Sequence, residues 1–257
     1  MLRTTFLPVG SVPVLTPTGY SLYVNPATGD DANPGTLALP LETITRALQL
    51  LAQRVFWEAP PTIVLADGDY SAEGGGQIAM GWITPPATDD GSYLGPAFYM
   101  VGDTVTPANV ILPYLTLHGT RCLISGVDAT NGLDLYSGAV ASVASSRLNY
   151  LYVADSQADT LAGVTFLGAA AAAFDMAGKS TVNVINTVTV SGTPAYSAGF
   201  AQLLGAAATL NFAAQPTGSA TGKRYSIVGT GQITGTGADA NYLPGDAAGT
   251  IVSTQYV

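Results

Sequence analysis

Three aspartates in the middle of the chain have a spacing that suits carbohydrate chemistry. Asp134, Asp155 and Asp175 are separated by 21 and 20 residues. Hydrolysis of a glycosidic bond generally needs two carboxyl groups roughly 5 to 10 Å apart, one of them protonated. If the chain returns to the same place about every 20 residues, the three stack, and like charges so close raise the pKa of at least one. An aspartate in a turn after a strand also binds its own backbone; we favour that role and commit no catalytic residue.

Four aromatic residues are candidates for contacts with sugars. Tyr136, Tyr150 and Tyr152 lie between the outer two aspartates, and Trp82 lies in a turn-rich stretch. Their rings offer flat apolar faces on which a sugar can stack, with a polar edge beside them. Aromatic side chains in strands also pack on their neighbours, so both interpretations stay open.

Other chemistries have little support. A lyase would need calcium-binding acids beside a base, and the central region offers only Arg147 and Lys179 as bases. The single histidine, His118, and the single cysteine, Cys122, exclude a zinc site made of several His or Cys ligands. We expect no metal and no cofactor.

The charge of the chain is low and negative. Asp, Glu, Lys and Arg make up 10% of the 257 residues, against about 25% in a typical globular domain. The formal charge of −9, with Lys223-Arg224 as the one adjacent basic pair, argues against nucleic-acid binding, which needs clustered cations. A surface so poor in charge favours burial against identical copies, so we expect an oligomer.

Neither export nor membrane insertion is expected. Pro8, Gly10 and Pro13 interrupt any apolar core of a signal peptide near the start, and no run reaches the roughly 18 apolar residues of a membrane helix. The sequence therefore predicts synthesis in the cytoplasm without ordinary secretion.

The N-terminal third divides into an arm, a helix, a strand and a loop. Residues 1–19, with three prolines, predict an extended attachment arm. A helix is predicted over about 41–55, and a strand over 62–70. Residues 71–96 are too rich in turn residues for regular structure and predict a long loop. The apolar stripe of the helix is Ile44, Ala47, Leu48 and Leu51.

The rest of the chain predicts stacked strands. Strand candidates recur about every 20 residues with one longer step, as in the coils of a parallel β-helix; they centre on Val143, Val164, Val184 and Leu210. Five alanines at 169–173 favour a helix by propensity, but small side chains also suit a tight coil interior or a close subunit interface, which we favour. We predict a β-helix body over 20–221 and a separate β-rich cap or trimer clasp over 222–257.

Several motifs resemble a known group of proteins. They are Tyr23-Val-Asn-Pro-Ala-Thr-Gly-Asp-Asp31, Leu41-Glu-Thr-Ile-Thr-Arg-Ala-Leu48, Ile63-Val-Leu-Ala-Asp-Gly-Asp-Tyr70 and the segment 102–112. Together they resemble the opening of phage tail fibre and tailspike proteins with a pectate-lyase-like right-handed parallel β-helix, and residues 223–256 resemble the ending of the same group. The resemblance implies a homotrimer on the virion, host attachment, and in some members binding or cleavage of host polysaccharide.

These observations predict an all-β protein, a right-handed parallel β-helix with an N-terminal capping helix, in a bacteriophage tail. Its expected function is that of a rigid element that contacts the host surface, or other tail proteins through residues 1–19. The alternative is a polysaccharide depolymerase, a hydrolase or lyase, on the same fold. A bacterial surface adhesin is the third hypothesis, disfavoured because no signal peptide is expected.

Overall fold

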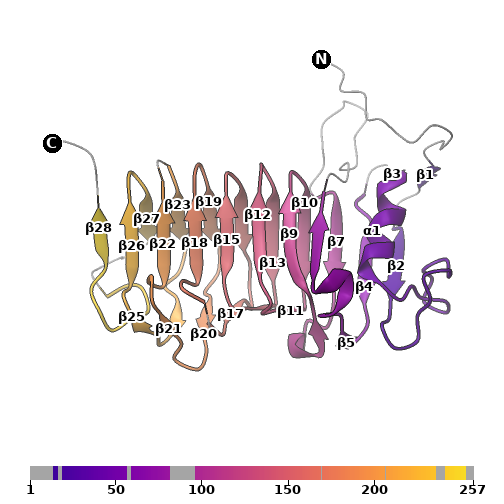
Figure 1. Cartoon of the computed structure of the whole chain (residues 1–257), viewed down its shortest axis with the longest axis horizontal. Helices are drawn as coiled ribbons and strands as arrows, with labels where there is room; N and C mark the ends of the chain where they lie inside the picture. Colours follow the sequence, from indigo (N-terminus) through magenta and orange to yellow (C-terminus); the bar gives the residue numbers. More distant parts are fainter. Residues whose placement is uncertain are drawn as a thin grey trace, which may run out of the picture.

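The protein is a parallel β-helix. The computed structural model describes residues 14–16, 19–56, 59–81, 96–168, 170–205, 207–235 and 241–252. In these residues the strands form three long sheets of nine, seven and eight strands and two short pairs, with every pairing parallel. The strands lie side by side along a rod, and the helix lies at its N-terminal end (Figure 1). The fold class predicted from the sequence, a parallel β-helix with a short N-terminal helix, is confirmed.

Sheet 1 contains, in spatial order, β2 (Ser21–Val24), β4 (Thr62–Leu65), β7 (Phe98–Val101), β10 (Arg121–Ser125), β13 (Val140–Ala144), β16 (Gln157–Thr160), β19 (Thr181–Val184), β23 (Thr209–Phe212) and β27 (Gln232–Gly235). Sheet 2 contains β5 (Gly68–Asp69), β8 (Val110–Ile111), β11 (Asp128–Ala129), β14 (Arg147–Leu148), β17 (Thr165–Phe166), β20 (Thr189–Val190) and β24 (Thr217–Gly218). Sheet 3 contains β6 (Gln77–Met80), β9 (Tyr114–His118), β12 (Leu133–Tyr136), β15 (Leu151–Ala154), β18 (Phe174–Ala177), β22 (Ala201–Leu204), β26 (Tyr225–Val228) and β28 (Thr250–Val252).

Each complete coil contributes one strand to each sheet, in the order sheet 1, sheet 2, sheet 3. Three of the four predicted strand centres, Val143, Val184 and Leu210, lie in sheet 1. Val164 does not: it immediately precedes β17 of sheet 2, and the register partner of Val143 is Thr160. The prediction failed there because this coil places a threonine, not a valine, at the inward position.

Alternation of side chains fixes which face of each strand is buried. In β12, β15 and β18, the residues Leu133, Leu151 and Phe174 are register partners and all point into the core. Burial of such side chains stabilises each by about 1.5–3 kcal/mol. Their sequence neighbours therefore point outward, and they form matching rows on the outer face.

A ladder of polar side chains runs along the outer face of sheet 1. Asn183 Nδ2 donates to Asp159 Oδ1 at 2.8 Å, and Asn211 Nδ2 donates to Asn183 Oδ1 at 2.9 Å. Thr234 Oγ1 continues the ladder by donating to Asn211 Oδ1 at 2.6 Å. Because these residues are register partners, the ladder stabilises the stacking of coils without charge.

The helix α1 (Ile44–Ala52) covers the N-terminal end of the rod and buries Ile44, Ala47 and Leu51. It begins later than the predicted residue 41, because Leu41 forms a bridge to Val24 and Thr43 is the N-cap. It ends before residue 55, because β3 (Arg54–Phe56) pairs with β1 (Val14–Thr16).

Two carboxylates satisfy the free N–H groups at the start of α1. Asp31 Oδ1 accepts from Glu42 N and Thr43 N at 3.1 and 2.9 Å. Glu73, two carboxylate oxygens on the next coil, accepts from Ile44 N at 3.0 Å and Thr45 N at 2.5 Å. Negative charge at a helix N-terminus is favourable, so these contacts hold the helix on the first coil.

The predicted arm and loop are partly ordinary structure. Within the arm predicted over 1–19, β1 pairs with β3 of the same chain, so this part is tied to the cap. Within the loop predicted over 71–96, the 3₁₀ helix η1 (Glu73–Gly75) and β6 are regular structure, which corrects the prediction; turn residues here end short elements rather than prevent them. Residues 82–95 lie outside the described residues.

The β-helix continues beyond the predicted boundary at residue 222. Strands β26 and β28 extend sheet 3, and β27 extends sheet 1. Two further elements complete the list: η2 (Pro107–Asn109), and the pair β21 (Ala195–Tyr196) with β25 (Thr221–Gly222). In the described part of the chain, residues 222–252 are thus further coils rather than a separate fold; the trimer clasp stays a prediction.

Replacement of Glu73 by alanine should destabilise the protein by about 1–2 kcal/mol, because two helix N–H groups lose their acceptor. Urea unfolding followed by circular dichroism measures this. Glu42→Ala is the matched control, since the Glu42 side chain is exposed and should change the free energy by less than about 0.5 kcal/mol. Equal effects of the two changes would contradict the assigned cap.

Candidate functional site

Two of the three predicted aspartates face the same cleft. In sheet 3, Asp134 is the register partner of Tyr152, and Tyr152 is the register partner of Asp175. The two aspartates are therefore separated by two strand spacings of about 4.8 Å, or roughly 10 Å between their Cα atoms. All three side chains stand on the outer face, because their neighbours in sequence fill the core.

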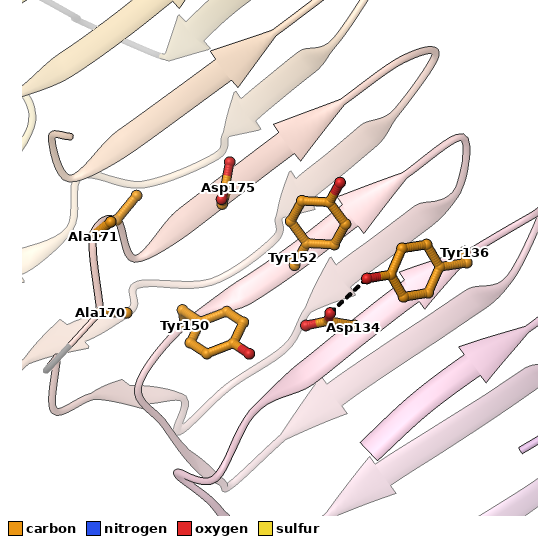
Figure 2. Close-up of a pocket in the computed structure, with 8 residues that line it drawn as sticks. Asp134, Tyr136, Tyr150, Tyr152, Ala170, Ala171 and Asp175 are labelled. Atoms are coloured by element: carbon orange, nitrogen blue, oxygen red, sulfur yellow. Dashed lines mark hydrogen bonds between the residues drawn. The ribbon is translucent and has the colours of Figure 1, made fainter. Parts of the chain in front are cut away.

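The cleft has a volume of about 260 Å³ and lies over β12, β15 and β18. Figure 2 shows the tyrosine rings and the two carboxylates around it, with the turn before β18 at its side. None of the described residues that line it is basic. They are Asp134, Tyr136, Tyr150, Tyr152, Ala170, Ala171, Ala172 and Asp175.

Asp134 is the buried centre of the site. Its side chain lies on the outer face, yet the residue is only 4% exposed. Its Oδ2 accepts hydrogen bonds from the hydroxyls of Tyr136, at 2.8 Å, and Tyr114. Its Oδ1 is buried and has no partner among the described residues. Such a group costs about 1–3 kcal/mol when nothing binds it.

Gly132 lets two tyrosines close over Asp134. Its φ is +133°, and a Cβ atom there would meet the Tyr114 ring at 2.4 Å and the Tyr150 hydroxyl at 2.6 Å. Any larger residue would displace the rings. The close approach explains why a glycine stands directly before strand β12.

Asp175 differs from Asp134 in its surroundings. Its Oδ1 is buried without a partner among the described residues. Partial burial, and then the nearby charge of Asp134, raise the pKa of Asp175 above its ordinary value of 3.8. Its protonated form is thus favoured, and such a carboxyl group can donate a hydrogen bond or a proton.

The tyrosines of the cleft are held in their neutral form. Burial is the largest cause that raises the pKa of Tyr114, Tyr136, Tyr150 and Tyr152, and the nearby carboxylates add to it. The hydroxyls therefore remain hydrogen-bond donors. Tyr136 is further supported by His118, whose ring stacks on it with centroids 5.1 Å apart and an angle of 13°.

Asp155 does not join the other two aspartates. It occupies a turn after β15 with a φ of +48°, and its Oδ1 accepts from the backbone N–H of Lys179 at 2.9 Å. The carboxylate thus supports the turn of the next coil, which is the structural role favoured from the sequence. Trp82 lies outside the described residues.

The remaining candidates lie away from the cleft. Arg147 pairs with Asp128 at 3.1 Å on the outer face of sheet 2. Cys122 is 2% exposed and belongs to the core, where burial raises the pKa of its thiol. No group of three or more His, Cys, Asp or Glu side chains suited to a metal ion occurs in the described part of the chain.

Sequence reasoning missed Tyr114, Gly132 and the alanine wall. Tyr114 and Gly132 act across coils, and no spacing within one strand indicates their contact. The described alanines, 170–173, form no helix; Ala172 and Ala173 are buried, while Ala170 to Ala172 line the cleft. Their small size leaves the space beside Tyr152 and Asp175 open.

Comparisons with known proteins give one match. Residues 27–81 are similar to a family described as a protein of unknown function, DUF1565. The match covers the capping helix and the first coil and ends before the cleft. No curated protein and no solved structure matches the chain significantly. In the described residues, no helix has the length and apolar character needed to cross a membrane.

Replacement of Asp134 by asparagine should lower the pKa of Asp175, because it removes the nearby negative charge. The pKa should stay above 3.8, since burial is the larger cause. Carbon-13 NMR of the carboxyl groups across a pH titration measures both values.

Asp155→Asn is the matched control for that titration. The asparagine oxygen can still accept from Lys179 N, and the pKa of Asp175 should not change. A pKa of Asp175 that is equally high in the Asp134→Asn variant would contradict the electrostatic link between the two carboxyl groups.

Proposed function

We propose that the protein is a rigid β-helical element of a bacteriophage tail that contacts a host surface polysaccharide through the cleft of sheet 3. One observation carries the proposal: tyrosine rings and carboxyl groups from three successive coils line a single cleft on the outside of the rod. Sugars present apolar C–H faces and many hydroxyls, which suit stacking on rings and hydrogen bonds to carboxylates.

The unsatisfied oxygens support a polar ligand. Asp134 Oδ1 and Asp175 Oδ1 are buried without partners among the described residues. Hydroxyl groups of a bound sugar would supply the missing donors, and the buried acceptors would then gain what they lack in the free protein. The open cleft admits chain-like ligands, which can continue along the row of sheet 3.

The setting of this cleft fits an attachment protein. Stacked coils give a stiff rod, which suits a part that transmits contact between a virion and a surface. The low charge supports a homotrimer, because shared uncharged faces would bury what a single chain exposes. Three copies of a weak site would bind a repetitive polysaccharide far more tightly than one. Residues 1–19 would attach to other tail proteins, and the resemblance of both ends of the chain supports this location.

Glycan hydrolysis is the second candidate function. It is favoured by the contrast between the two carboxyl groups: Asp175, with its raised pKa, suits a general acid, whereas Asp134 is held by two hydroxyl donors and suits a base. A separation of two strand spacings leaves room for a water molecule and favours inversion of the anomeric carbon.

Replacement of Tyr152 by alanine should weaken binding of surface oligosaccharides about tenfold, because the central ring of the cleft is lost. Binding is measured by calorimetry with a panel of capsule and lipopolysaccharide oligosaccharides. Tyr23→Ala, at the half-buried outer position of β2, is the control and should bind as the unchanged protein does. A panel without any ligand, or equal loss in both variants, would contradict the proposed site.

If the protein cleaves its ligand, Asp134→Asn and Asp175→Asn should each lower the rate by about 10²-fold or more. Asp155→Asn should retain the full rate, since its carboxylate lies outside the cleft. Chromatography of the products measures the rates, and proton NMR of fresh products should show inversion. Undiminished cleavage by Asp175→Asn would exclude the assigned acid; a protein that binds without cleaving supports contact alone.

A further inference from the structure

A second, larger cleft lies on another side of the rod, over the outer face of sheet 2. Its volume is about 430 Å³, within the roughly 300–1,000 Å³ usual for small-molecule sites. The segment between β7 and η2 forms one wall, and the turns after β13 and β16 form the floor. Among its lining residues are Val105, Pro107, Ser145, Arg147, Thr165 and Ser191.

Arg147 presents its positive charge to this cleft. Its Nη1 lies 3.1 Å from Asp128 Oδ2, but the two side chains differ in exposure, 34% for Arg147 and 9% for Asp128. The carboxylate is thus inside and also accepts from Thr130 N at 3.1 Å. A guanidinium group has five N–H donors, and within the described residues no other hydrogen bond of Arg147 is found. The remaining donors are available to a ligand.

Hydroxyl groups surround the guanidinium. Thr165 is the register partner of Arg147 on the next coil, and Ser145 and Ser191 line the same cleft. The side chains of these three residues make no hydrogen bond to any other described residue. They offer donors and acceptors that can reorient to suit a polyhydroxylated ligand.

The opposite wall is apolar and held firmly. Val105 is 90% exposed, the highest value for a large apolar side chain in the described chain. Asp103 Oδ1 fixes its loop by accepting from Val105 N at 2.8 Å and Thr106 N at 2.9 Å, and Asp103 Oδ2 accepts from Asn109 Nδ2 at 3.3 Å. The Asp103 carboxylate is therefore engaged within its own loop, and the fold itself gives no reason to hold Val105 in water.

We propose that this second cleft binds an acidic sugar. The sugar carboxylate would pair with the Arg147 guanidinium, the ring hydroxyls would bind Ser145, Thr165 and Ser191, and the C–H face would pack on Val105 and Pro107. A carboxylate fits because two parallel N–H donors of arginine match its two oxygens. The proposal does not depend on the cleft of sheet 3, which none of its described lining residues supplies with a cation.

The test is a titration of the full chain with D-glucuronate and with D-glucose, followed by amide NMR and calorimetry. Glucuronate should shift the amides of Arg147, Thr165 and Val105, and it should bind at least about tenfold more tightly than glucose. Equal affinity for both sugars, no binding of glucuronate, or shifts confined to the cleft of sheet 3 would overturn the proposal.

Matched variants separate binding from folding. Arg147→Gln alone would leave the Asp128 charge buried and unpaired, which destabilises, so the double change Asp128→Asn with Arg147→Gln is used. It should retain the unfolding midpoint within a few degrees and lose glucuronate binding by about tenfold or more. If the double variant folds and binds glucuronate as the unchanged protein does, the proposal fails.

A single change makes the sharper prediction. Asp128→Asn removes the competing carboxylate, so the freed guanidinium should bind glucuronate several-fold more tightly, and the affinity for glucose should stay the same. Unchanged or weaker glucuronate binding by a folded Asp128→Asn protein would show that Arg147 does not face the ligand.

Discussion

The register between parallel coils is the constraint on which everything else depends. Each strand of sheet 3 pairs with the next so that inward residues meet inward residues: Leu133 with Leu151, and Leu151 with Phe174. Because side chains alternate along a strand, the same register sets Asp134, Tyr152 and Asp175 in one outward row. A slip of one residue would place the carboxylates in the core and the leucines in water. The hydrophobic effect that selects the fold therefore also assembles the cleft.

The sequence predicts the fold well, because alternation and turn residues are local signals. It predicts the site only in part. Equal steps of about 20 residues suggested that all three aspartates stack, but the actual steps along the row are 18 residues to Tyr152 and 23 to Asp175. The two errors cancel over two coils, so the outer aspartates coincide while Asp155 falls in a turn. The unequal steps arise from the turns, whose length the strand pattern does not constrain: the segment with the alanines lengthens the coil before β18.

Contacts between coils account for the rest of what the sequence did not reveal. Tyr114 reaches Asp134 from the preceding coil, and Gly132 provides the space for it. Glu73 likewise caps a helix 29 residues earlier in the chain. In each case the two partners belong to different strands or loops, so neither residue type nor local spacing identifies the pair. A solenoid makes such contacts systematic, since every outward residue has neighbours one coil away in both directions.

The cleft is also expensive for the fold, and the core beneath it offsets that cost. Two buried oxygens without partners among the described residues each cost about 1–3 kcal/mol, and the raised pKa of Asp175 reflects the same loss of water. Directly inside the cleft, Phe174 packs against Phe166, Phe200 and Phe212 with centroids 4.9, 5.6 and 5.8 Å apart. Aromatic pairs of this kind contribute about 0.5–1.5 kcal/mol each beyond the area that they bury. The strand that carries Asp175 is thus fixed from inside by rings, and it can hold a desolvated carboxyl group outside without the local loosening that a less well-packed coil would allow.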